Sequence, residues 1–462
     1  MKKVYIETLG CQMNKSDTER MLGMLSCLGY EEIKDVTNPK SDELKNADLL
    51  IVNTCSIRQL SEDKAYSKLG LWGKWKKTRK NLKIAMCGCV AQQAKESVFK
   101  RMPYVDLVFG THNLYELPDL IKRIERGERV CAAGDKPVEE KDFQINRQKG
   151  VGAWIPITEG CNNFCTYCIV PYTRGRERSR AIEIIIKEAQ DALNAGFKEI
   201  TLLGQNVDSY GKDFSKETGN GKQETEASVH PDKINLAYLL RELNALEGNF
   251  RIRFTTSYPT DITDELIDTA VNLDKVCECF HIPMQSGSSE ILKKMNRRYD
   301  RETYAEIVKK VREKVKDVTI TSDFIAGFPG ESEEQFEETL SAMREFELDY
   351  CNTAAYSPRE GTIAAKWTDL FLSEEEKVQR LLRLNDQNKA NCLKSNKSFI
   401  GSELEVLGET FEDHKGKNIL TGRTRNNKIV HIECDENLVG EFINVKIIGA
   451  KTWYLNGVKS KK

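Results

Sequence analysis

Apolar and polar positions along the chain first predict an α/β domain. In residues 1–125, apolar runs that suit buried strands alternate with helical patterns, and these runs are VYIETLG, ADLLIVNTC and LKIAMCGC. Such alternation is typical of a parallel sheet with helices on its faces. A polar stretch, roughly residues 132–150, has few apolar anchors and is interpreted as a linker. We therefore expect a first domain over residues 2–125.

The alternation resumes near residue 152 and is longer. Six strand-like runs are separated by helical patterns, and they read WIPITEG, KEITLLG, FRIRFTTS, CECFHIPMQ, VTITSDFIAG and DYCNTAAYS. Six strand–helix units predict a partial (β/α)6 barrel, short of the eight units in a complete TIM barrel. Polar sequence at about 212–233 interrupts this pattern and is interpreted as a surface insertion. The second domain is predicted over residues 147–389.

The period changes again after a charged helical pattern that starts at Ser373. Beyond residue 396, five short strand-like runs are separated by turn residues such as Asn456-Gly457. Five short strands in so short a segment predict a small closed barrel of the OB type over residues 392–457. The expected fold class is therefore α/β and multidomain, with a parallel-sheet domain, a partial barrel and a small C-terminal β-barrel.

Composition narrows the class of protein. The chain has 462 residues, of which 39% are hydrophobic and 31% charged, and it has 14 cysteines. This apolar content excludes disorder as the main state, and no apolar run reaches the ~18 residues of a membrane span. The amino end carries no apolar signal segment, so we expect a cytoplasmic protein with reduced thiols. In that compartment, clustered cysteines indicate metal binding or catalysis.

A net charge of −1 hides local patches, so it does not exclude a nucleic-acid partner. Three basic groups stand out in the sequence: residues 64–83 with Trp72 and Trp75, the arginines Arg174, Arg176, Arg178 and Arg180, and, in the small barrel, Lys415, Lys417, Arg423, Arg425 and Lys428. Basic stretches interleaved with aromatic side chains are typical of RNA contacts. The alternatives are solvated helix faces and pairing with acids elsewhere in the chain.

The strongest local signal is CNNFCTYC. It places Cys161, Cys165 and Cys168 directly after the predicted strand at 154–158. Three thiolates in one short loop suit the soft ligand set of an iron–sulfur cluster. They are one ligand short of a structural zinc site, and an iron with an open position can bind a substrate or a cofactor. A zinc site completed by a distant Cys or His is the alternative.

A second set of cysteines is dispersed in sequence but consistent in position. Cys11, Cys55 and Cys89 each stand where a predicted strand of the first domain ends. Open α/β sheets bind ligands at the carboxyl ends of their strands, so these thiols are expected to meet. Cys87, still within its strand, is the rival to Cys89, and ordinary buried cysteines are the alternative. The remaining cysteines show no ligand spacing and are interpreted as structural: Cys27, Cys131, Cys277, Cys279, Cys351, Cys392 and Cys434.

With both sets in hand, the chain resembles a known family. A CxxxCxxC motif after the first strand of a partial barrel resembles the radical S-adenosylmethionine (SAM) superfamily. The order TLGCQMN, NTC, GCVAQ, CNNFCTYC, VPYTRGRERSR, LLGQNV, RFTTSYP, PMQSGS and a terminal β-barrel is similar to that of the methylthiotransferases, which join an amino-terminal cluster domain, a radical SAM core and a TRAM domain. Within that family, VPYTRGRE, LLGQNVDSYG and RIRFTTSYP most resemble the branch that acts on N6-dimethylallyladenosine in tRNA. The resemblance covers nearly the whole chain apart from 212–233.

The resemblance implies a reaction and its cofactors. The enzyme would methylthiolate C2 of N6-dimethylallyladenosine beside the anticodon, at position 37 of the tRNA. It would use two SAM molecules, one as methyl donor and one as the source of a 5′-deoxyadenosyl radical, and sulfur from an auxiliary cluster. By the same resemblance, Cys161, Cys165 and Cys168 hold one [4Fe-4S] cluster, and Cys11, Cys55 and Cys89 hold the auxiliary [4Fe-4S] cluster, which faces the first across the substrate.

The resemblance also implies SAM contacts and partners. Gly204, Gln205 and Asn206 stand at the methionine-amine motif, Glu331 in the turn that could approach the adenine, and Ser257 and Gln285 at the strand ends between them. Polar residues at strand ends are often only loop caps. The implied partners are the anticodon stem-loop of tRNA, an electron donor and proteins that donate sulfur or iron–sulfur clusters. A monomer without membrane association is expected.

Three alternatives remain at the level of sequence. One is a sibling enzyme that acts on threonylcarbamoyladenosine in tRNA. Another is an enzyme for an aspartate of a ribosomal protein, which the basic terminal barrel disfavours because ribosomal proteins are themselves usually basic. The third, from a different class, is a metal-containing RNA-binding protein without catalysis.

Overall fold

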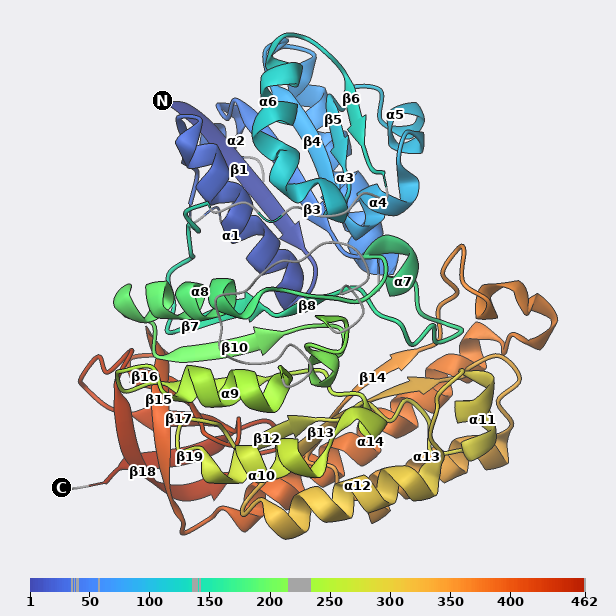
Figure 1. Cartoon of the computed structure of the whole chain (residues 1–462), viewed down its shortest axis with the longest axis vertical. Coiled ribbons are helices and arrows are strands. Elements are labelled where there is room, and N and C mark those ends of the chain that lie inside the picture. The colour runs from blue at the N-terminus through green and yellow to red at the C-terminus, as the bar shows by residue number, and fades with distance from the viewer. Residues whose placement is uncertain are drawn as a thin grey trace.

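A computed structural model describes residues 1–34, 36, 38, 41–56, 59–134, 140, 143–214 and 234–460. The described chain forms three domains, which Figure 1 shows as a blue α/β domain, a green to orange partial barrel and a red β-barrel. The predicted insertion at 212–233 lies outside the described residues except for 212–214. None of the helices that the structure describes is long and apolar enough to cross a membrane.

The amino-terminal domain is a six-stranded parallel sheet with the strand order β2-β1-β3-β4-β5-β6. Its strands are β1 (Lys2–Leu9), β2 (Tyr30–Glu32), β3 (Leu49–Thr54), β4 (Lys83–Gly88), β5 (Leu107–Phe109) and β6 (Val130–Ala132). Its helices are α1 (Gln12–Cys27), α2 (Asp42–Lys45), α3 (Gln59–Lys76), α4 (Cys89–Ala94), α5 (Ser97–Arg101) and α6 (Leu117–Glu125). Apolar side chains of α1 and α6 cover one face of the sheet, and those of α3 and α4 cover the other. The predicted parallel α/β domain is confirmed.

The middle domain is an open barrel of six strands in chain order. Two three-stranded parallel sheets, β7-β10-β11 and β12-β13-β14, are joined by a parallel bridge between Ile252 and Val276. The strands are β7 (Gly152–Pro156), β10 (Glu199–Leu203), β11 (Arg251–Phe254), β12 (Cys279–His281), β13 (Thr319–Ala326) and β14 (Tyr350–Ala355). The helices between them include α8 (Ile182–Asn194), α9 (Leu236–Asn244), α10 (Asp264–Asn272), α11 (Ser289–Lys294), α12 (Arg301–Lys314) and α13 (Glu333–Glu345). The predicted partial barrel is confirmed.

The long helix α14 (Glu374–Ser398) leads from the open barrel to the closed one. Ser373 caps it by accepting a hydrogen bond from the Glu376 amide. The closed barrel follows the order β15-β16-β17-β19-β18. Its strands are β15 (Glu403–Asp413), β16 (Asn418–Thr424), β17 (Ile429–Glu433), β18 (Phe442–Ala450) and β19 (Leu455–Lys459). The predicted five-stranded barrel is confirmed.

Two arginines of β11 fasten the closed barrel to the open one. Arg251 donates a hydrogen bond to one main-chain oxygen of residues 423–425, and Arg253 donates to the other two, at 2.6–3.0 Å. Glu199 accepts from Arg251 Nε at 2.6 Å and from Arg253 Nε at 2.8 Å. Burial raises the pKa of Glu199, but the two guanidiniums outweigh it and hold that pKa at about 2. The carboxylate thus keeps both arginines aimed at the turn after β16.

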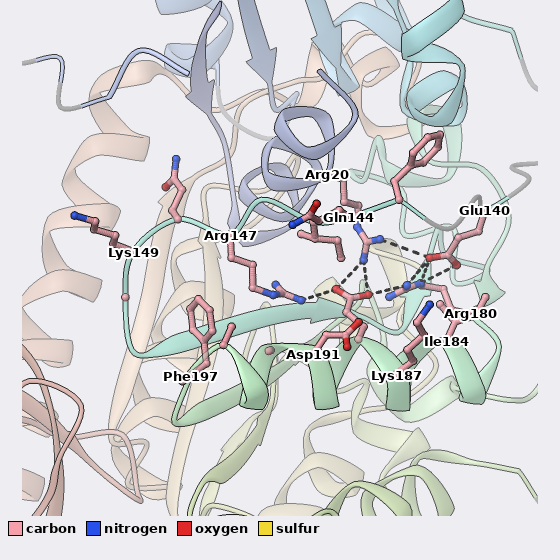
Figure 2. A pocket seen from close by; sticks show the side chains of 18 residues that line it. Arg20, Glu140, Gln144, Arg147, Lys149, Arg180, Ile184, Lys187, Asp191 and Phe197 are labelled. Atoms are coloured by element: carbon pink, nitrogen blue, oxygen red, sulfur yellow. Dashed lines mark hydrogen bonds and ion pairs between the residues drawn. The ribbon is translucent and has the colours of Figure 1, made fainter. Parts of the chain in front are cut away.

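A second buried network joins the amino-terminal domain to the open barrel. Glu188 of α8 pairs with Arg20 of α1, with Arg147 of the interdomain segment and with Arg180, each at 2.8 Å. Figure 2 shows these three arginines converging from separate segments at the side of a cleft of about 870 Å³. All four side chains are at most 8% exposed. The network therefore sets how the first domain lies on the second.

Candidate metal centres

The three dispersed cysteines meet at one edge of the amino-terminal sheet. The last residues of β1, β3 and β4 are aligned with one another across the sheet. Cys11, Cys55 and Cys89 follow these strand ends within two residues. The Cys55 thiol forms a hydrogen bond with Cys11, and this bond is the main reason that the pKa of Cys11 is lowered to about 6. Register alone therefore brings together thiols that lie up to 78 positions apart in the sequence.

Two asparagines hold the Cys11 loop in place. Asn14 Oδ1 accepts from the Cys11 amide at 3.2 Å, and Asn14 Nδ2 donates to Asn53 Oδ1 at 3.1 Å. Asn53 Nδ2 donates back to the Asn14 carbonyl at 2.8 Å. A Cβ on Gly10 would stand 2.2 Å from Asn14 Oδ1, and one on Gly88 would stand 2.6 Å from Asn53 Oδ1. The glycines that precede Cys11 and Cys89 thus leave room for this pair.

The structure separates Cys87 from Cys89. The Cys87 thiol lies in the core between the sheet and α1, 3.8 Å from the sulfur of Met21. Burial raises the pKa of Cys87 well above its ordinary value, which disfavours the thiolate that a metal binds. Cys89 begins α4 at the sheet edge. This placement favours Cys89 over Cys87 as the third ligand of this set.

The second cysteine set occupies one loop at the carboxyl end of the open barrel. Cys161, Cys165 and Cys168 lie between β8 (Thr158–Glu159) and α7 (Val170–Thr173). The turn at 294–297 clasps this loop, since the Thr166 amide donates to the Met295 carbonyl at 3.1 Å and Asn296 donates to the Phe164 carbonyl at 3.0 Å. The loop is therefore fixed from the far side of the barrel.

The charge of Cys165 helps to raise the pKa of the two other thiols in this loop. Burial, followed by the charge of Cys165, raises the pKa of Cys168 to about 12. Burial also raises the pKa of Cys161, with a further contribution from Cys165. A raised pKa keeps the protons on Cys161 and Cys168, and a bound cation displaces such protons because it supplies the missing positive charge.

A helix beside one cysteine set packs against a helix beside the other. Helix α4 begins at Cys89, α7 follows Cys168, and α4 packs on α7. Figure 1 shows both helices where the first domain meets the open barrel. Thr111, after β5, donates a hydrogen bond to the Thr173 carbonyl at 2.6 Å and ties the two loops together. Both sets therefore face the same junction between the domains.

Two arginines cross this junction toward the first cysteine set. Arg174, directly after α7, pairs with Asp17 of α1 at 2.8 Å and is buried. Burial would lower the pKa of Arg174, but Asp17 and the thiols of Cys89 and Cys11 raise it. Arg359, after β14, donates to Gln59 at the start of α3 at 3.0 Å. The first and last strands of the open barrel thus each send a cation to this edge.

The spacing of the thiols bears on the kind of metal. Within the described residues, no three His, Cys, Asp or Glu side chains are grouped as a metal ion would require. All ligands of one zinc ion converge to about 2.3 Å from a single point, whereas the thiolates of an iron–sulfur cluster bind separate irons and stand further apart. Thiols are nevertheless the donors that iron–sulfur clusters take.

Buried polar atoms without a partner mark the carboxyl ends of the first two barrel strands. Thr158 Oγ1, Gln205 Oε1 and Asp208 Oδ2 accept or donate no hydrogen bond within the described part of the chain. Each such atom costs about 1–3 kcal/mol unless a ligand or water satisfies it. A Cβ on Gly204 would stand 2.2 Å from Thr158 Oγ1, so the glycine permits this close approach. The acceptors here suit a ligand with hydrogen-bond donors, such as the ammonium group of SAM.

Asn206 and Ser257 are occupied by neighbours. Asn206 donates to Asp261 at 2.6 Å and accepts from the Tyr258 amide at 3.2 Å. Ser257 donates to Asp208 Oδ1 at 3.1 Å. Both therefore position the strand ends and the Asp208 carboxylate. Direct contact of either with SAM stays a prediction.

Gln285 and Glu331 differ in what they offer to a ligand. Gln285 has a φ of +78°, and Thr256, beside Ser257, has a φ of +75°. Such strain costs about 1–3 kcal/mol per residue and concentrates at functional sites. The Glu331 side chain is fully buried and accepts from the Gly327 amide at 2.8 Å and from Arg380 at 2.9 Å. Glu331 thus braces its turn from inside, whereas Gln285 lies at a strained strand end.

Sequence reasoning did not single out Asp208 or Arg297. Asp208 lies four residues beyond Gly204 in LLGQNVDSYG, and a polar residue so close to a strand end was the available signal. Arg297 donates a hydrogen bond to the Cys165 sulfur at 3.3 Å. Nothing in the local pattern distinguishes it from its neighbour Arg298. Arg174 was noted only as a member of a basic group.

The structure bears out the alternative of pairing with acids for about half of the residues in the three basic groups, and RNA contact stays a prediction. Trp72 is 1% exposed and belongs to the core. The following basic side chains pair with acids from other parts of the chain: Lys68 with Glu7, Lys76 with Asp106, Arg174 with Asp17, Arg178 with Glu159, Arg180 with Glu188, Lys417 with Glu433, Arg423 with Glu409, Arg425 with Glu278 and Lys428 with Asp349. These acids lie outside the basic stretches themselves, so a count of charge within each stretch could not reveal the pairing.

Comparison with protein families gives three matches. The Radical SAM superfamily matches residues 155–343, Uncharacterized protein family UPF0004 matches residues 3–110, and the TRAM domain matches residues 397–459. Together these matches cover parts of all three domains seen in the structure.

The chain is also similar to curated proteins over nearly its full length. A protein of Acetivibrio thermocellus is 43% identical over 461 residues, which cover 99% of this chain and 91% of that protein. One of Alkaliphilus oremlandii is 44% identical over 99% of this chain and 92% of its own. One of Clostridium botulinum is 43% identical over 98% and 96%. Each of the three is named tRNA-2-methylthio-N(6)-dimethylallyladenosine synthase.

Solved structures share the fold at low identity. The radical SAM methyltransferase TsrM from Kitasatospora setae, with cobalamin and a [4Fe-4S] cluster bound, has a TM-score of 0.56 at 14% identity, over 79% of this chain and 77% of that one. The cobalamin-dependent radical enzyme OxsB has a TM-score of 0.52 at 14% identity, over 82% of this chain and 56% of its own. At this identity both similarities concern the fold alone.

Proposed function

This chain belongs to the family of the tRNA-2-methylthio-N(6)-dimethylallyladenosine synthases, and from that premise we propose its reaction and its site residues. It is a radical SAM enzyme that methylthiolates tRNA, with two [4Fe-4S] clusters and SAM as cofactors. The bond formed joins a methylthio group to C2 of N6-dimethylallyladenosine beside the anticodon, in place of hydrogen. One observation carries the site assignment: the packing of α4 on α7, which places two sets of three cysteines at one junction.

We assign the cluster ligands by set. Cys161, Cys165 and Cys168 hold the cluster that binds SAM, and Cys11, Cys55 and Cys89 hold the auxiliary cluster. The donor chemistry supports this, because each set offers three thiols and leaves one position open for a non-protein ligand. When bound, the clusters and SAM supply the electron, the hydrogen-abstracting radical and the sulfur and methyl groups of the product.

The chain's own residues provide placement and charge. Arg174 and Arg359 bring positive charge to the auxiliary edge, where thiolates and sulfur are negative. The network around Glu188 fixes the first domain on the barrel, so that both cysteine sets stand on either side of the same N6-dimethylallyladenosine base. Both effects are electrostatic preorganisation, which requires no rearrangement at the moment of reaction.

We assign the ammonium group of SAM to Gln205 Oε1 and Asp208 Oδ2, with Ser257 holding the Asp208 carboxylate. The orphaned acceptors support this contact. Gly204 permits the close approach of the two strand ends, and Asn206, Gln285 and Glu331 shape the same rim. In this proposal, the methionine-amine motif acts through two oxygen atoms, Gln205 Oε1 and Asp208 Oδ2.

Asp208→Asn tests this assignment through SAM affinity. Burial raises the pKa of Asp208 to about 7, so its carboxylate is ionised above pH 7 and attracts an ammonium only there. We expect SAM binding to the oxidised holoenzyme to weaken as the pH falls from 7.5 to 6, measured by equilibrium dialysis. The variant should bind about 10- to 100-fold more weakly, as for loss of a charged hydrogen bond, with no pH dependence in that range.

Asp261→Asn is the matched control for this experiment. The charge of Asp261 raises the pKa of Asp208, so its removal should move the pH midpoint downward and keep the dependence. A pH profile that survives Asp208→Asn unchanged would contradict the ammonium contact. Asp208 would then serve only to hold the strand ends.

We further propose the following organisation. Residues 2–125 form the auxiliary-cluster domain, 147–389 the radical SAM core and 392–457 the TRAM domain, although β6 carries the first sheet on to Ala132. The anticodon stem-loop binds at the junction of the domains. The enzyme works as a cytoplasmic monomer with separate protein donors of electrons and of sulfur or clusters. The cytoplasmic location is supported by the substrate, because tRNA is present in the cytoplasm.

Mass spectrometry of tRNA nucleosides tests the substrate. Cells that lack this protein should accumulate N6-dimethylallyladenosine without its methylthio group, and the cloned gene should restore the product. Loss of a methylthiolated threonylcarbamoyladenosine instead would overturn the proposed base and assign the sibling reaction. The purified protein should carry about eight irons after anaerobic reconstitution, as two four-iron clusters require. A colourless protein with one zinc would exclude both reactions.

A further inference from the structure

The turn after α11 sets one guanidinium against the cysteine loop. Arg297 Nη1 donates to Cys165 Sγ at 3.3 Å, and Nη2 donates to the Pro283 carbonyl at 3.1 Å. Its Nε donates to the Tyr299 hydroxyl at 2.7 Å. Three separate partners therefore fix the plane and direction of this side chain, and one arm points at a sulfur that we assign as a cluster ligand.

No carboxylate balances this charge within the described residues. The guanidinium lies over the rings of Tyr258 and Tyr299, at 4.4 and 4.9 Å from their centroids. Asp323, the acid whose charge reaches it, bonds His281 and Asn352 instead. Arg297 is half-buried, and a negative group beside such a partly desolvated cation stabilises it. Thiolates bound to iron are such a group.

We propose that Arg297 is a positioning residue that acts through the Cys165 sulfur and favours the reduced form of the SAM-binding cluster. This inference rests on the assignment of Cys165 as a ligand. One electron, supplied by an external donor, enters the cluster, and no bond or proton changes. The cluster with its three thiolates becomes one unit more negative, and a cationic hydrogen bond to a ligating sulfur stabilises that state more than the oxidised one.

The same turn performs a second task that must be kept apart from the first. Asn296 and the Met295 carbonyl clasp the main chain of residues 163–166 without carrying charge. Arg298, the next residue, is exposed, and its side chain bonds nothing in the described part of the chain. The chain thus offers one variant for the clasp alone, Asn296→Ala, and one for an uninvolved arginine, Arg298→Gln.

An EPR-monitored redox titration without SAM tests the proposal. The parent protein is the full chain with Cys11, Cys55 and Cys89 changed to alanine, so that one cluster gives the signal. We expect Arg297→Gln to lower the ratio of reduced to oxidised cluster at a fixed potential about tenfold, which corresponds to 59 mV for a one-electron couple. Arg297→Lys should lie between the parent and Arg297→Gln, because it keeps the charge but not the planar fork. Asn296→Ala and Arg298→Gln should match the parent.

The outcomes separate the two assignments. An unchanged midpoint in Arg297→Gln with full iron content overturns the role of Arg297. A difference that emerges only when SAM is added also overturns it, since the guanidinium would then serve the SAM carboxylate. If Arg297→Gln takes up no cluster, Arg297→Lys decides, and a midpoint equal to that of the parent overturns the proposal. The iron content of the parent tests the ligand assignment separately. If the parent binds no cluster, and adding Cys165→Ala to it leaves its iron content and EPR spectrum unchanged, then the assignment of Cys165 as a ligand is wrong.

Discussion

Cys165→Ala will cleave no SAM, whereas Cys89→Ala will cleave SAM and leave the tRNA unmodified. Each variant removes one of three thiolates from one cluster, and a short loop or sheet edge offers no replacement. Iron content should fall from about eight to about four per chain in either case. The measurements are 5′-deoxyadenosine formed with dithionite as reductant, and methylthiolated nucleoside in the tRNA. The two variants therefore separate SAM cleavage from methylthio transfer, and each does so by the loss of one sulfur atom.

Cys87→Ala is the control for Cys89→Ala. The two residues are separated by one glycine, yet Cys87 is buried against Met21 and Cys89 stands at the sheet edge. We expect Cys87→Ala to retain both activities and its full iron content, with a cost in stability from the lost core sulfur. If Cys87→Ala abolishes methylthiolation and Cys89→Ala does not, the auxiliary ligand set must be redrawn. Deoxyadenosine formation by Cys165→Ala would refute the assignment of the SAM-binding cluster.

Glu188→Gln should destabilise the junction of the first two domains by about 3–5 kcal/mol, because it leaves buried arginines without their counter-ion. Arg20, Arg147 and Arg180 all pair with this carboxylate. The free energy of the first unfolding transition in urea measures the loss. A loosened junction should also lower the yield of methylthiolated tRNA more than that of 5′-deoxyadenosine, because only the former needs both cysteine sets on one base.

The same residue gives a pH dependence with a definite sign. Burial raises the pKa of Glu188, but the arginines outweigh it and lower the pKa from 4.5 to about 2. A carboxyl whose pKa is depressed in the folded state contributes stability above its unfolded pKa and loses it as the pH falls toward the folded value. About 3 kcal/mol should therefore disappear between pH 4.5 and pH 2 in the wild type and be absent from Glu188→Gln.

Asp191→Asn is the matched control on the same helix. Asp191 lines the same cleft, one turn further along α8, but it is exposed and pairs with none of the described side chains. We expect Asp191→Asn to change neither the free energy of the first unfolding transition in urea nor the loss of stability between pH 4.5 and pH 2. If Glu188→Gln behaves like Asp191→Asn, the domains are held by other contacts.

The architecture could be predicted because its signals are local. Apolar runs such as those of β1, β3 and β4 identify buried parallel strands, and Cys11, Cys55 and Cys89 could be grouped because strand ends in a parallel sheet share one edge. The loop with Cys161, Cys165 and Cys168 carries its own spacing. Strand periodicity and motif spacing were therefore enough to group the six cysteines into two sets, and their role as cluster ligands stays a prediction.

Charge pairing and strain could not be predicted in this way. Arg174 meets Asp17 across 157 positions of sequence, and Arg425 meets Glu278 across 147. Both arginines read as unbalanced when only neighbours in sequence are considered. The left-handed backbone of Gln285, a residue that needs no such conformation by itself, is imposed by the register of β13. These features depend on which segments meet, and that is settled only when the domains are assembled.

At the end of β16, Arg251 and Arg253 contact main-chain atoms of residues 423–425 rather than their side chains. Arg251 and Arg253 bind carbonyl oxygens, which every sequence possesses. Side chains of the same segment add specific contacts, because Arg425 pairs with Glu278 and Lys428 with Asp349. The feature to preserve is the left-handed Asn427 in the turn after β16, with a φ of +64°. Part of what holds the closed barrel on the open one is thus independent of side-chain identity, and substitutions on the barrel's outer face leave these three hydrogen bonds intact.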